Sequence, residues 1–250
     1  MKKAQAQLLL MVVVFAVAAF SFGAYMLGSK APKIKSIQVY YPFALSNKVD
    51  PRETLNVADQ VLTEYVFGYH VQRSFKKGIV DVLSSIKIDP LKKTLTFTPN
   101  SLIMRSDGTK FEIDSYCQSI KASFSGTLHA SFKETLIGFE CTKSEVIVRL
   151  KEIPVNMNFL FTTPEFSIYE PSKLPISTNN LPPTTGPYFV ERLEPTKAIL
   201  RRNIYYPESL VANKIENVEL NWQKVEIKDL DPNKHHLSYH YGFAIDEQAR

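Results

Sequence analysis

Residues 106–124 read SDGTKFEIDSYCQSIKASF and combine a turn with a helical pattern. Asp107-Gly108 predicts a tight turn, because glycine tolerates a positive φ and the aspartate side chain bonds nearby backbone groups. Apolar residues then recur at helical spacing, which predicts an amphipathic helix from about Ile113 to Phe124. One face of this helix carries Ile113, Tyr116, Cys117, Ile120 and Phe124.

Strands and one further helix are predicted on both sides of this segment. Toward the N-terminus, the patterns predict a strand at 37–41, a helix at 53–67 and a hairpin of strands at 86–88 and 94–98. Toward the C-terminus, strands are predicted at 145–152, 188–190, 198–201 and 218–227. Five prolines between Pro171 and Pro187 predict an extended loop. Helices and strands that do not alternate regularly indicate an α/β fold of the mixed α+β kind with a mixed sheet.

The composition is that of a globular protein and excludes several classes of function. Of 250 residues, 44% are apolar and 22% are charged, which argues against disorder and fibrous repeats. The net charge is +5, yet no run of Lys or Arg exceeds two residues, so the sequence lacks the basic patch of a nucleic-acid binder. We therefore predict no nucleic-acid partner.

The N-terminus has the layout of an export signal. Lys2 and Lys3 precede an almost unbroken apolar stretch from Leu8 to Leu27, which is also long enough to span a bilayer as a helix. The sequence predicts two segments: residues 1–29 as a signal peptide or membrane anchor, and residues 30–250 as an exported domain. Cleavage and retention of the apolar helix both stay open.

Two cysteines stand in the exported part. Cys117 and Cys141 could form a disulfide in an oxidising compartment, or remain two buried thiols. The sequence does not decide between these alternatives.

Five segments, in this order, resemble a known family of binding proteins. They are Asp50-Pro51 with the helix to Tyr69, the hairpin Ser84–Phe97, Ser106–Phe111 with its helix to Lys121, Thr185–Tyr188, and Arg202–Tyr206. They resemble the extracytoplasmic solute-binding proteins of the oligopeptide, dipeptide and nickel ABC-importer family (family 5). Ile86 stands where the family usually has Trp, and Thr184 stands where it usually has Gly.

The resemblance implies part of a periplasmic-binding-protein type II lobe, preceded by the N-terminal hydrophobic helix. It covers about residues 36–225, and family members are typically more than twice the length of this chain. It implies a peptide-type solute-binding protein of an ABC transporter, truncated or degenerate, in the periplasm or cell envelope, with anchoring to the inner membrane left open. The implied partners are a peptide or other small solute, the importer's permease subunits, and the membrane if the helix is uncleaved. The alternative is a membrane-anchored structural or interaction protein that keeps the lobe as a docking surface.

The candidate ligand-binding residues follow the first strand, end the first helix, or lie near the end of the resemblance. For the aromatics near the first strand and the first helix, a core role is favoured over ligand contact, and for the tryptophan the sequence does not decide between core and cleft wall. The candidates are Tyr41, Phe43, Ser46, Tyr65, Phe67, Tyr69 and Trp222. A second set is interpreted as structural, forming turns or clamping loops: Asp107, Gly108, Gly186, Pro187, Tyr188, Arg202 and Asn203.

Enzymatic motifs are lacking in the sequence, so we predict that the protein is not an enzyme and needs no cofactor. It contains neither a G-x-S-x-G elbow nor an H-E-x-x-H helix. His235, His236 and His240 lie in a polar segment near the C-terminus, where a solvated role is favoured over a metal site. We predict no metal.

Overall fold

The computed structural model describes residues 35–53, 56–74, 78–100, 103–126, 134–155, 157–207, 215–222 and 236–238. These residues all belong to one compact unit that begins at Lys35. The predicted N-terminal helix, His235, His240 and the predicted strand beyond Trp222 lie outside the described residues. Within these ranges, no helix is long and apolar enough to cross a membrane.

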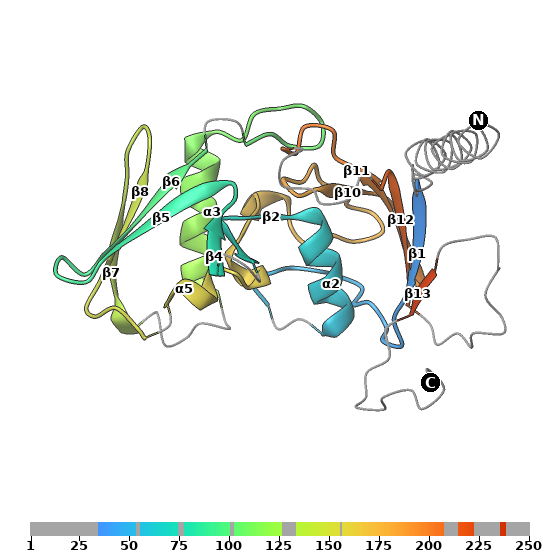
Figure 1. Ribbon diagram of the computed structural model, residues 1–250, viewed down its shortest axis with the longest axis horizontal. Coiled ribbons are helices and arrows are strands. Elements are labelled where there is room, and N and C mark those ends of the chain that lie inside the picture. Colours follow the sequence, from blue (N-terminus) through green and yellow to red (C-terminus); the bar gives the residue numbers. More distant parts are fainter. Residues whose placement is uncertain are drawn as a thin grey trace, which may run out of the picture. The chain divides into compact units, whose positions relative to one another are not determined.

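A five-stranded mixed sheet forms one side of the unit (Figure 1). Its strands, in spatial order, are β10 (Tyr188–Glu194), β11 (Lys197–Arg202), β12 (Asn217–Asn221), β1 (Ser36–Tyr40) and β13 (His236–Ser238). β1 pairs in parallel with both β12 and β13, whereas β11 is antiparallel to both of its neighbours. The carboxyl ends of β12, β1 and β13 therefore meet at one edge of the sheet.

Helix α2 (Val57–Val66) packs its apolar face against this sheet. Ala58, Leu62 and Val66 are fully buried at helical spacing. The helix begins with a capping box, in which the Asn56 side chain accepts from the Asp59 N–H and the Asp59 carboxylate accepts from the Asn56 N–H. Described residues 56–66 thus confirm the predicted helix, with a start later than residue 53.

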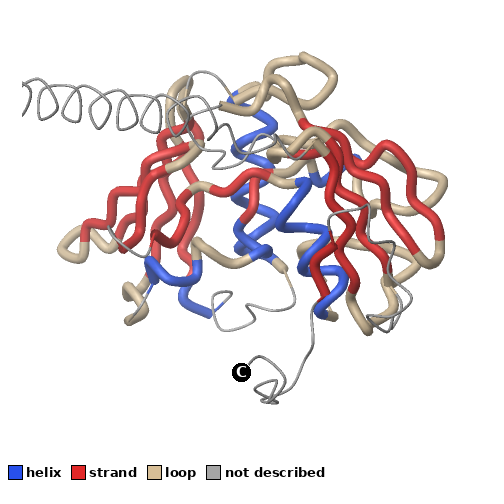
Figure 2. Tube along the Cα trace, turned by 45° about the vertical axis from the view of Figure 1, so that its right-hand side comes forward, coloured by secondary structure: helices blue, strands red, loops and turns tan. Residues whose placement is uncertain are grey.

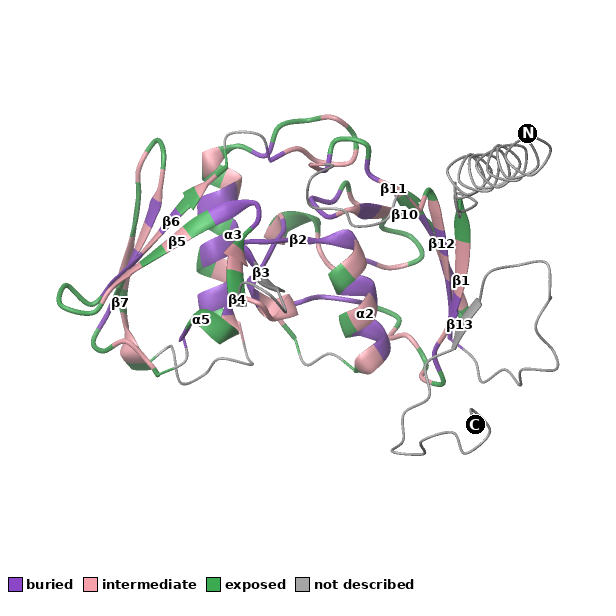
Figure 3. Ribbon diagram, viewed as in Figure 1, coloured by how far each residue is buried: buried purple, intermediate pink, exposed green. Residues whose placement is uncertain are grey.

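A second, four-stranded sheet is wholly antiparallel. Its strands, in spatial order, are β5 (Ser84–Asp89), β6 (Thr94–Pro99), β8 (Val146–Leu150) and β7 (Leu136–Cys141). Helix α3 (Ile113–Ser125) covers one face of this sheet with Tyr116, Ile120 and Phe124, which are fully buried. Figure 3 shows buried residues alternating with exposed ones along the two longer helices. The hairpin, the helix and the strand predicted near residue 146 are confirmed.

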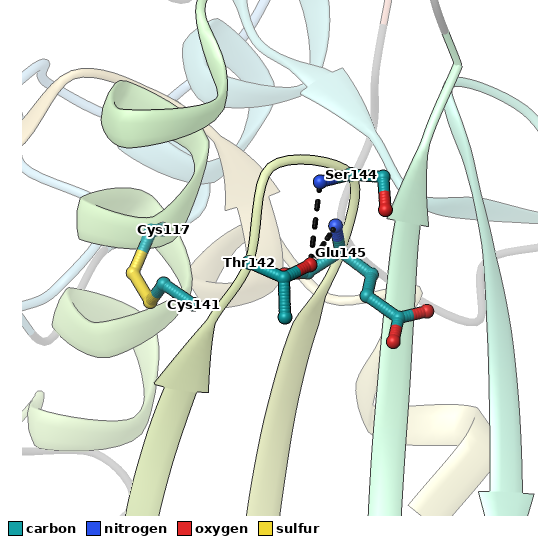
Figure 4. The surroundings of a disulfide bond; sticks show 5 residues. All are labelled: Cys117, Cys141, Thr142, Ser144 and Glu145. Atoms are coloured by element: carbon teal, nitrogen blue, oxygen red, sulfur yellow. Dashed lines mark hydrogen bonds between the residues drawn. A yellow bond between two sulfur atoms is a disulfide. The ribbon is translucent and has the colours of Figure 1, made fainter.

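The two cysteines form a disulfide that fastens α3 to the edge strand β7 (Figure 4). Their Cα atoms lie 6.2 Å apart, and 24 positions separate them in the sequence. The turn after Cys141 is closed by Thr142, whose hydroxyl accepts from the backbone N–H groups of Ser144 and Glu145. Of the two alternatives left open by the sequence, the structure has the disulfide.

Short elements connect the two larger sheets, and α2 and α3 lie between them (Figure 2). They comprise β2 (Gly68–Tyr69) paired with β9 (Ser167–Ile168), β3 (Val71–Ser74) paired with β4 (Gly78–Asp81), α5 (Met157–Leu160), η2 (Pro164–Phe166) and η3 (Pro171–Lys173). The extended loop predicted between Pro171 and Pro187 begins with η3, where the prediction is wrong, and residues 174–187, all described, form no helix or regular strand, as predicted. The mixed α/β fold predicted from the sequence is confirmed for the described residues.

Candidate functional site

The carboxyl ends of the parallel strands define the edge where a ligand is expected. In open sheets, ligands bind in the crevice outside the carboxyl ends of parallel strands. Tyr41, Pro42 and Phe43 follow β1 directly, and Trp222 follows β12. The chain thus brings aromatic side chains from two distant segments to this edge.

Tyr41 and Trp222 are in direct contact there. Their ring centroids lie 5.6 Å apart with an interplanar angle of 35°. The contact is fixed by the backbone, since the Tyr41 N–H donates to the Asn221 carbonyl at 2.8 Å and the Trp222 N–H donates to the Thr196 carbonyl at 2.8 Å. Trp222 Nε1 is buried and meets no acceptor among the residues that the structure describes. A buried N–H donor without a partner is uncommon in folded proteins.

The loop after β1 continues this edge toward the start of α2. Phe43 is half-buried and packs against the same core cluster as Tyr41. Ser46 is held by Asp59, whose carboxylate accepts from the Ser46 backbone N–H at 2.8 Å and from its hydroxyl at 2.6 Å. We call Tyr41, Phe43, Ser46 and Trp222 the binding edge.

The other three candidate aromatics lie at the far end of α2. Tyr65 packs edge-on against Tyr188, with ring centroids 5.7 Å apart. Phe67 packs edge-on against Tyr169 at 5.9 Å and is buried. Tyr69 is buried as well, and this burial raises the pKa of its hydroxyl above the ordinary value. Because α2 is about 15 Å long, the structure separates these residues from the binding edge.

The Asp107-Gly108 turn has the geometry that its sequence predicts. Gly108 adopts a φ of +82°, which favours glycine. Asp107 Oδ1 accepts from the Thr109 N–H at 3.0 Å and from its hydroxyl at 2.6 Å, and this bonding contributes to a lowered pKa of the Asp107 carboxyl. Arg105 joins the turn to the proline-rich loop, because its guanidinium bonds the Lys110 carbonyl at 2.8 Å and Glu170 at 3.0 Å.

The loop that carries Gly186, Pro187 and Tyr188 is clamped from both sides. The Gly186 N–H donates to the Val66 carbonyl at 2.9 Å, so closely that an added Cβ would lie 2.4 Å from Val66 C. Asn203 donates its side-chain amide to the Gly186 carbonyl at 2.9 Å and its backbone N–H to the Pro187 carbonyl at 2.8 Å. The predicted clamp is confirmed for Asn203.

Neighbouring residues anchor the same clamp to the sheet. Tyr188 donates its hydroxyl to the Ile215 carbonyl at 3.1 Å. The backbone N–H of Arg202 donates to the Glu216 carbonyl at 2.9 Å. The loop and the start of β12 are therefore tied together.

A buried polar cluster that sequence reasoning missed lies beside α3 and the four-stranded sheet. His70 Nδ1 lies 2.7 Å from the Ser84 hydroxyl and 3.0 Å from the Tyr116 hydroxyl. Complete burial lowers the pKa of His70 to about 3, so the imidazole is neutral at physiological pH. All three side chains are buried, and a single histidine between tyrosine and valine gives no sequence signal of the cluster.

Two surface hollows lie away from the binding edge. One, of about 510 Å³, lies over β10, β11 and β12 and is lined by Glu191, Arg192, Ile199, Arg201 and Asn217. The other, of about 500 Å³, lies between the Asp107 turn and the proline-rich loop. Within the described ranges, no group of three His, Cys, Asp or Glu side chains is placed to hold a metal ion.

Comparisons with known proteins show which solved structures this chain resembles. No protein-family model and no curated protein matches the chain. Among solved structures, an ABC transporter substrate-binding protein from Sinorhizobium meliloti shares 16% identity at a TM-score of 0.62, over 74% of this chain and 39% of that one. Listeria monocytogenes OppA bound to peptide shares 12% identity at a TM-score of 0.63, over 76% of this chain and 43% of that one. NikA from Staphylococcus aureus in complex with Ni(L-His)2 shares 17% identity at a TM-score of 0.59, over 76% of this chain and 39% of that one.

These similarities establish the fold. The described part of this chain has the fold of these solute-binding proteins, and it spans about two-fifths of their length. This share is consistent with the N-terminal portion that the sequence motifs indicate.

Proposed function

We propose that this chain is an exported, peptide-type solute-binding protein, or a lobe of one, that serves an ABC importer. The observation that carries the proposal is the match in fold to substrate-binding proteins such as OppA bound to peptide. The export signal predicted from residues 1–29 supports it, because a binding protein of this kind works outside the cytoplasm. The permease subunits of the importer are the proposed protein partners.

The binding edge is the proposed contact surface for the solute. An extended peptide is held partly through its backbone, so a site for it needs exposed polar groups beside apolar surface. Here Phe43 and Ser46 are partly exposed at the loop after β1, and Trp222 supplies a buried N–H that meets no acceptor among the described residues. We propose no catalytic group, metal or cofactor at this edge.

Thermal unfolding with and without a pool of short peptides tests the proposal. A ligand at 100 times its Kd stabilises the folded state by about 2.7 kcal/mol. For a domain of this size, that should raise the Tm by about 5–10 °C. The full chain in detergent should show such a shift with at least one peptide of the pool.

Matched variants locate the site. Phe43→Ala removes a half-buried side chain of the binding edge and should reduce the peptide-induced shift. Leu91→Ala changes a side chain that is 95% exposed in the β5–β6 turn, and should leave the shift intact. A cooperative transition that no peptide shifts would contradict solute capture and favour the alternative, a lobe kept as a docking surface.

A further inference from the structure

The hollow between the Asp107 turn and the proline-rich loop has walls that hydrogen bonds hold in place. Its volume of about 500 Å³ lies in the range of small-molecule sites. The turn is closed by the Arg105 N–H, which donates to the Thr109 carbonyl at 2.8 Å. Ser106 ties the turn to the loop, because its N–H donates to the Thr184 carbonyl at 2.8 Å and its hydroxyl accepts from the Thr184 N–H at 3.1 Å.

The opposite wall of the hollow is organised by Asn180. Its side-chain amide donates to the carbonyls of Lys173 at 2.8 Å and Pro175 at 2.7 Å. Its backbone exchanges two hydrogen bonds with Ser177, each 3.0 Å long. A ligand that enters such a preorganised site orders little of the chain, so less of the binding free energy is lost to conformational entropy.

One side of the hollow is apolar. Leu181, Pro182 and Pro183 line it, and the Leu181 side chain is 37% exposed. Burying an apolar group of a ligand against these three residues would remove apolar surface from water, which is favourable.

Four charged side chains line the hollow, two of each sign: Arg105, Lys173, Asp107 and Glu170. Arg105 and Glu170 form an ion pair at 3.0 Å, with side-chain exposures of only 15% and 21%. Asp107 and Lys173 are exposed, belong to opposite walls, and form no ion pair with any residue that the structure describes. A carboxylate on one wall and an ammonium group on the other are therefore both available to a ligand.

Arg105 adds a further donor among the residues that line the hollow. Its guanidinium lies over the Phe111 ring, 4.9 Å from the centroid, and its Nη1 and Nη2 atoms donate to the Lys110 carbonyl and to Glu170, among others. Its Nε is buried and meets no acceptor within the described ranges, which is uncommon for a buried donor. The hollow thus holds more donors than the acceptors of the described chain use.

We propose that this hollow binds a small zwitterion with an apolar side chain, of the size of a free amino acid or a dipeptide. Its ammonium group donates to the Asp107 carboxylate, and its carboxylate accepts from the Lys173 ammonium group. Its side chain packs on Leu181 and Pro182. The site is separate from the binding edge, and the inference holds whether or not that edge captures a peptide.

Isothermal titration calorimetry of the full chain in detergent tests the ligand chemistry. Leucine and leucyl-leucine are titrated separately, and saturable binding of at least one of them is expected. The tighter of the two identifies the ligand as amino acid or dipeptide. Acetylating its amine or amidating its carboxyl removes one ion pair each, and either change should weaken binding about fivefold or more, because a hydrogen bond between charged groups is lost.

Two charge-removing variants locate the site. Asp107→Asn keeps an acceptor oxygen for the turn, and Lys173→Gln changes an exposed side chain, so both should fold. Each should weaken binding of the zwitterion about fivefold or more. The matched controls, Asp89→Asn and Lys92→Gln, alter the β5–β6 turn, where Asp89 Oδ1 accepts from the Lys92 N–H at 3.0 Å, and should leave the affinity unchanged.

The binding edge provides the remaining control. Phe43→Ala should leave the affinity for the zwitterion unchanged, which separates this site from the proposed peptide site. Cooperative thermal unfolding of each variant shows that it is folded. The proposal is overturned if neither zwitterion binds, if the acetylated or amidated compound binds equally well, if Asp107→Asn and Lys173→Gln bind like the unaltered chain, or if Phe43→Ala weakens binding as much as they do.

Discussion

Reduction of the Cys117–Cys141 disulfide is the perturbation whose effect follows most directly from the fold. The bond fastens α3 to β7, the edge strand of the four-stranded sheet. Among the described strands, β7 pairs with β8 alone, and none of its residues is buried. Without the bond, the unfolded chain gains conformational freedom, and β7 loses its covalent attachment to the helix.

The magnitude follows from the length of chain that the bond closes. The two cysteines are 24 positions apart, for which the chain-entropy model gives about 3.5 kcal/mol at 25 °C. In a domain of about 200 residues, 1 kcal/mol corresponds to roughly 2–4 °C in Tm. Reduction should therefore lower the Tm by about 7–14 °C. The fold should persist, because the buried face of α3 still packs on the sheet.

Denaturant unfolding of the oxidised and the reduced protein measures this difference. The double variant Cys117→Ala/Cys141→Ala should behave like the reduced protein, with a small further loss because Cys117 is buried. Reductant added to the double variant is the control and should change nothing. A loss below about 1 kcal/mol on reduction would refute the reasoning, since the bond would then constrain the unfolded chain far less than its loop length requires.

Three further predictions concern a buried histidine, a closely packed glycine and a helix cap. The free energy of unfolding should fall as the pH drops from about 6.5 toward 3. In this range the unfolded chain protonates His70, whereas the folded protein, in which the pKa of His70 is about 3, does not. Urea titrations over this pH range should show a smaller loss of unfolding free energy for His70→Gln. Gly186→Ala should destabilise by about 1–3 kcal/mol, because its Cβ would meet the Val66 backbone, whereas Gly138→Ala, with open space around it, should cost far less in the same thermal assay. Asn56→Ala should cost about 1 kcal/mol through loss of the α2 cap, and an unchanged midpoint would contradict that role.

Local sequence patterns predict elements in which apolar residues repeat at a regular spacing, and turns that need a residue such as glycine. The helix at 113–125 followed from five apolar positions on one face, and the turn before it from Gly108, whose φ is +82°. The hairpin of β5 and β6 followed from two strand-like runs around a five-residue turn. These features depend on residues close in the sequence, so they can be predicted from the sequence alone.

Features that depend on distant partners could not be predicted. β2 and β9 have two residues each and exist only because they pair with one another. The Cys117–Cys141 pairing needed the placement of β7 beside α3, and the spacing of two cysteines does not provide that. Tyr41 and Trp222 were both candidates, yet only the parallel pairing of β1 with β12 shows that they meet. The same packing places Tyr65 at the other end of α2, against Tyr188.

Emission from Trp222 tests most directly whether solute is captured at the binding edge, because the only tryptophan lies there, in contact with Tyr41. The measurement is a fluorescence titration of the full chain with those peptides of the pool that raise its Tm. We predict a saturable change in Trp222 emission that weakens with Phe43→Ala and persists with Leu91→Ala. An emission that stays constant, while the same peptides stabilise the fold, would place their site elsewhere and contradict the proposed binding edge.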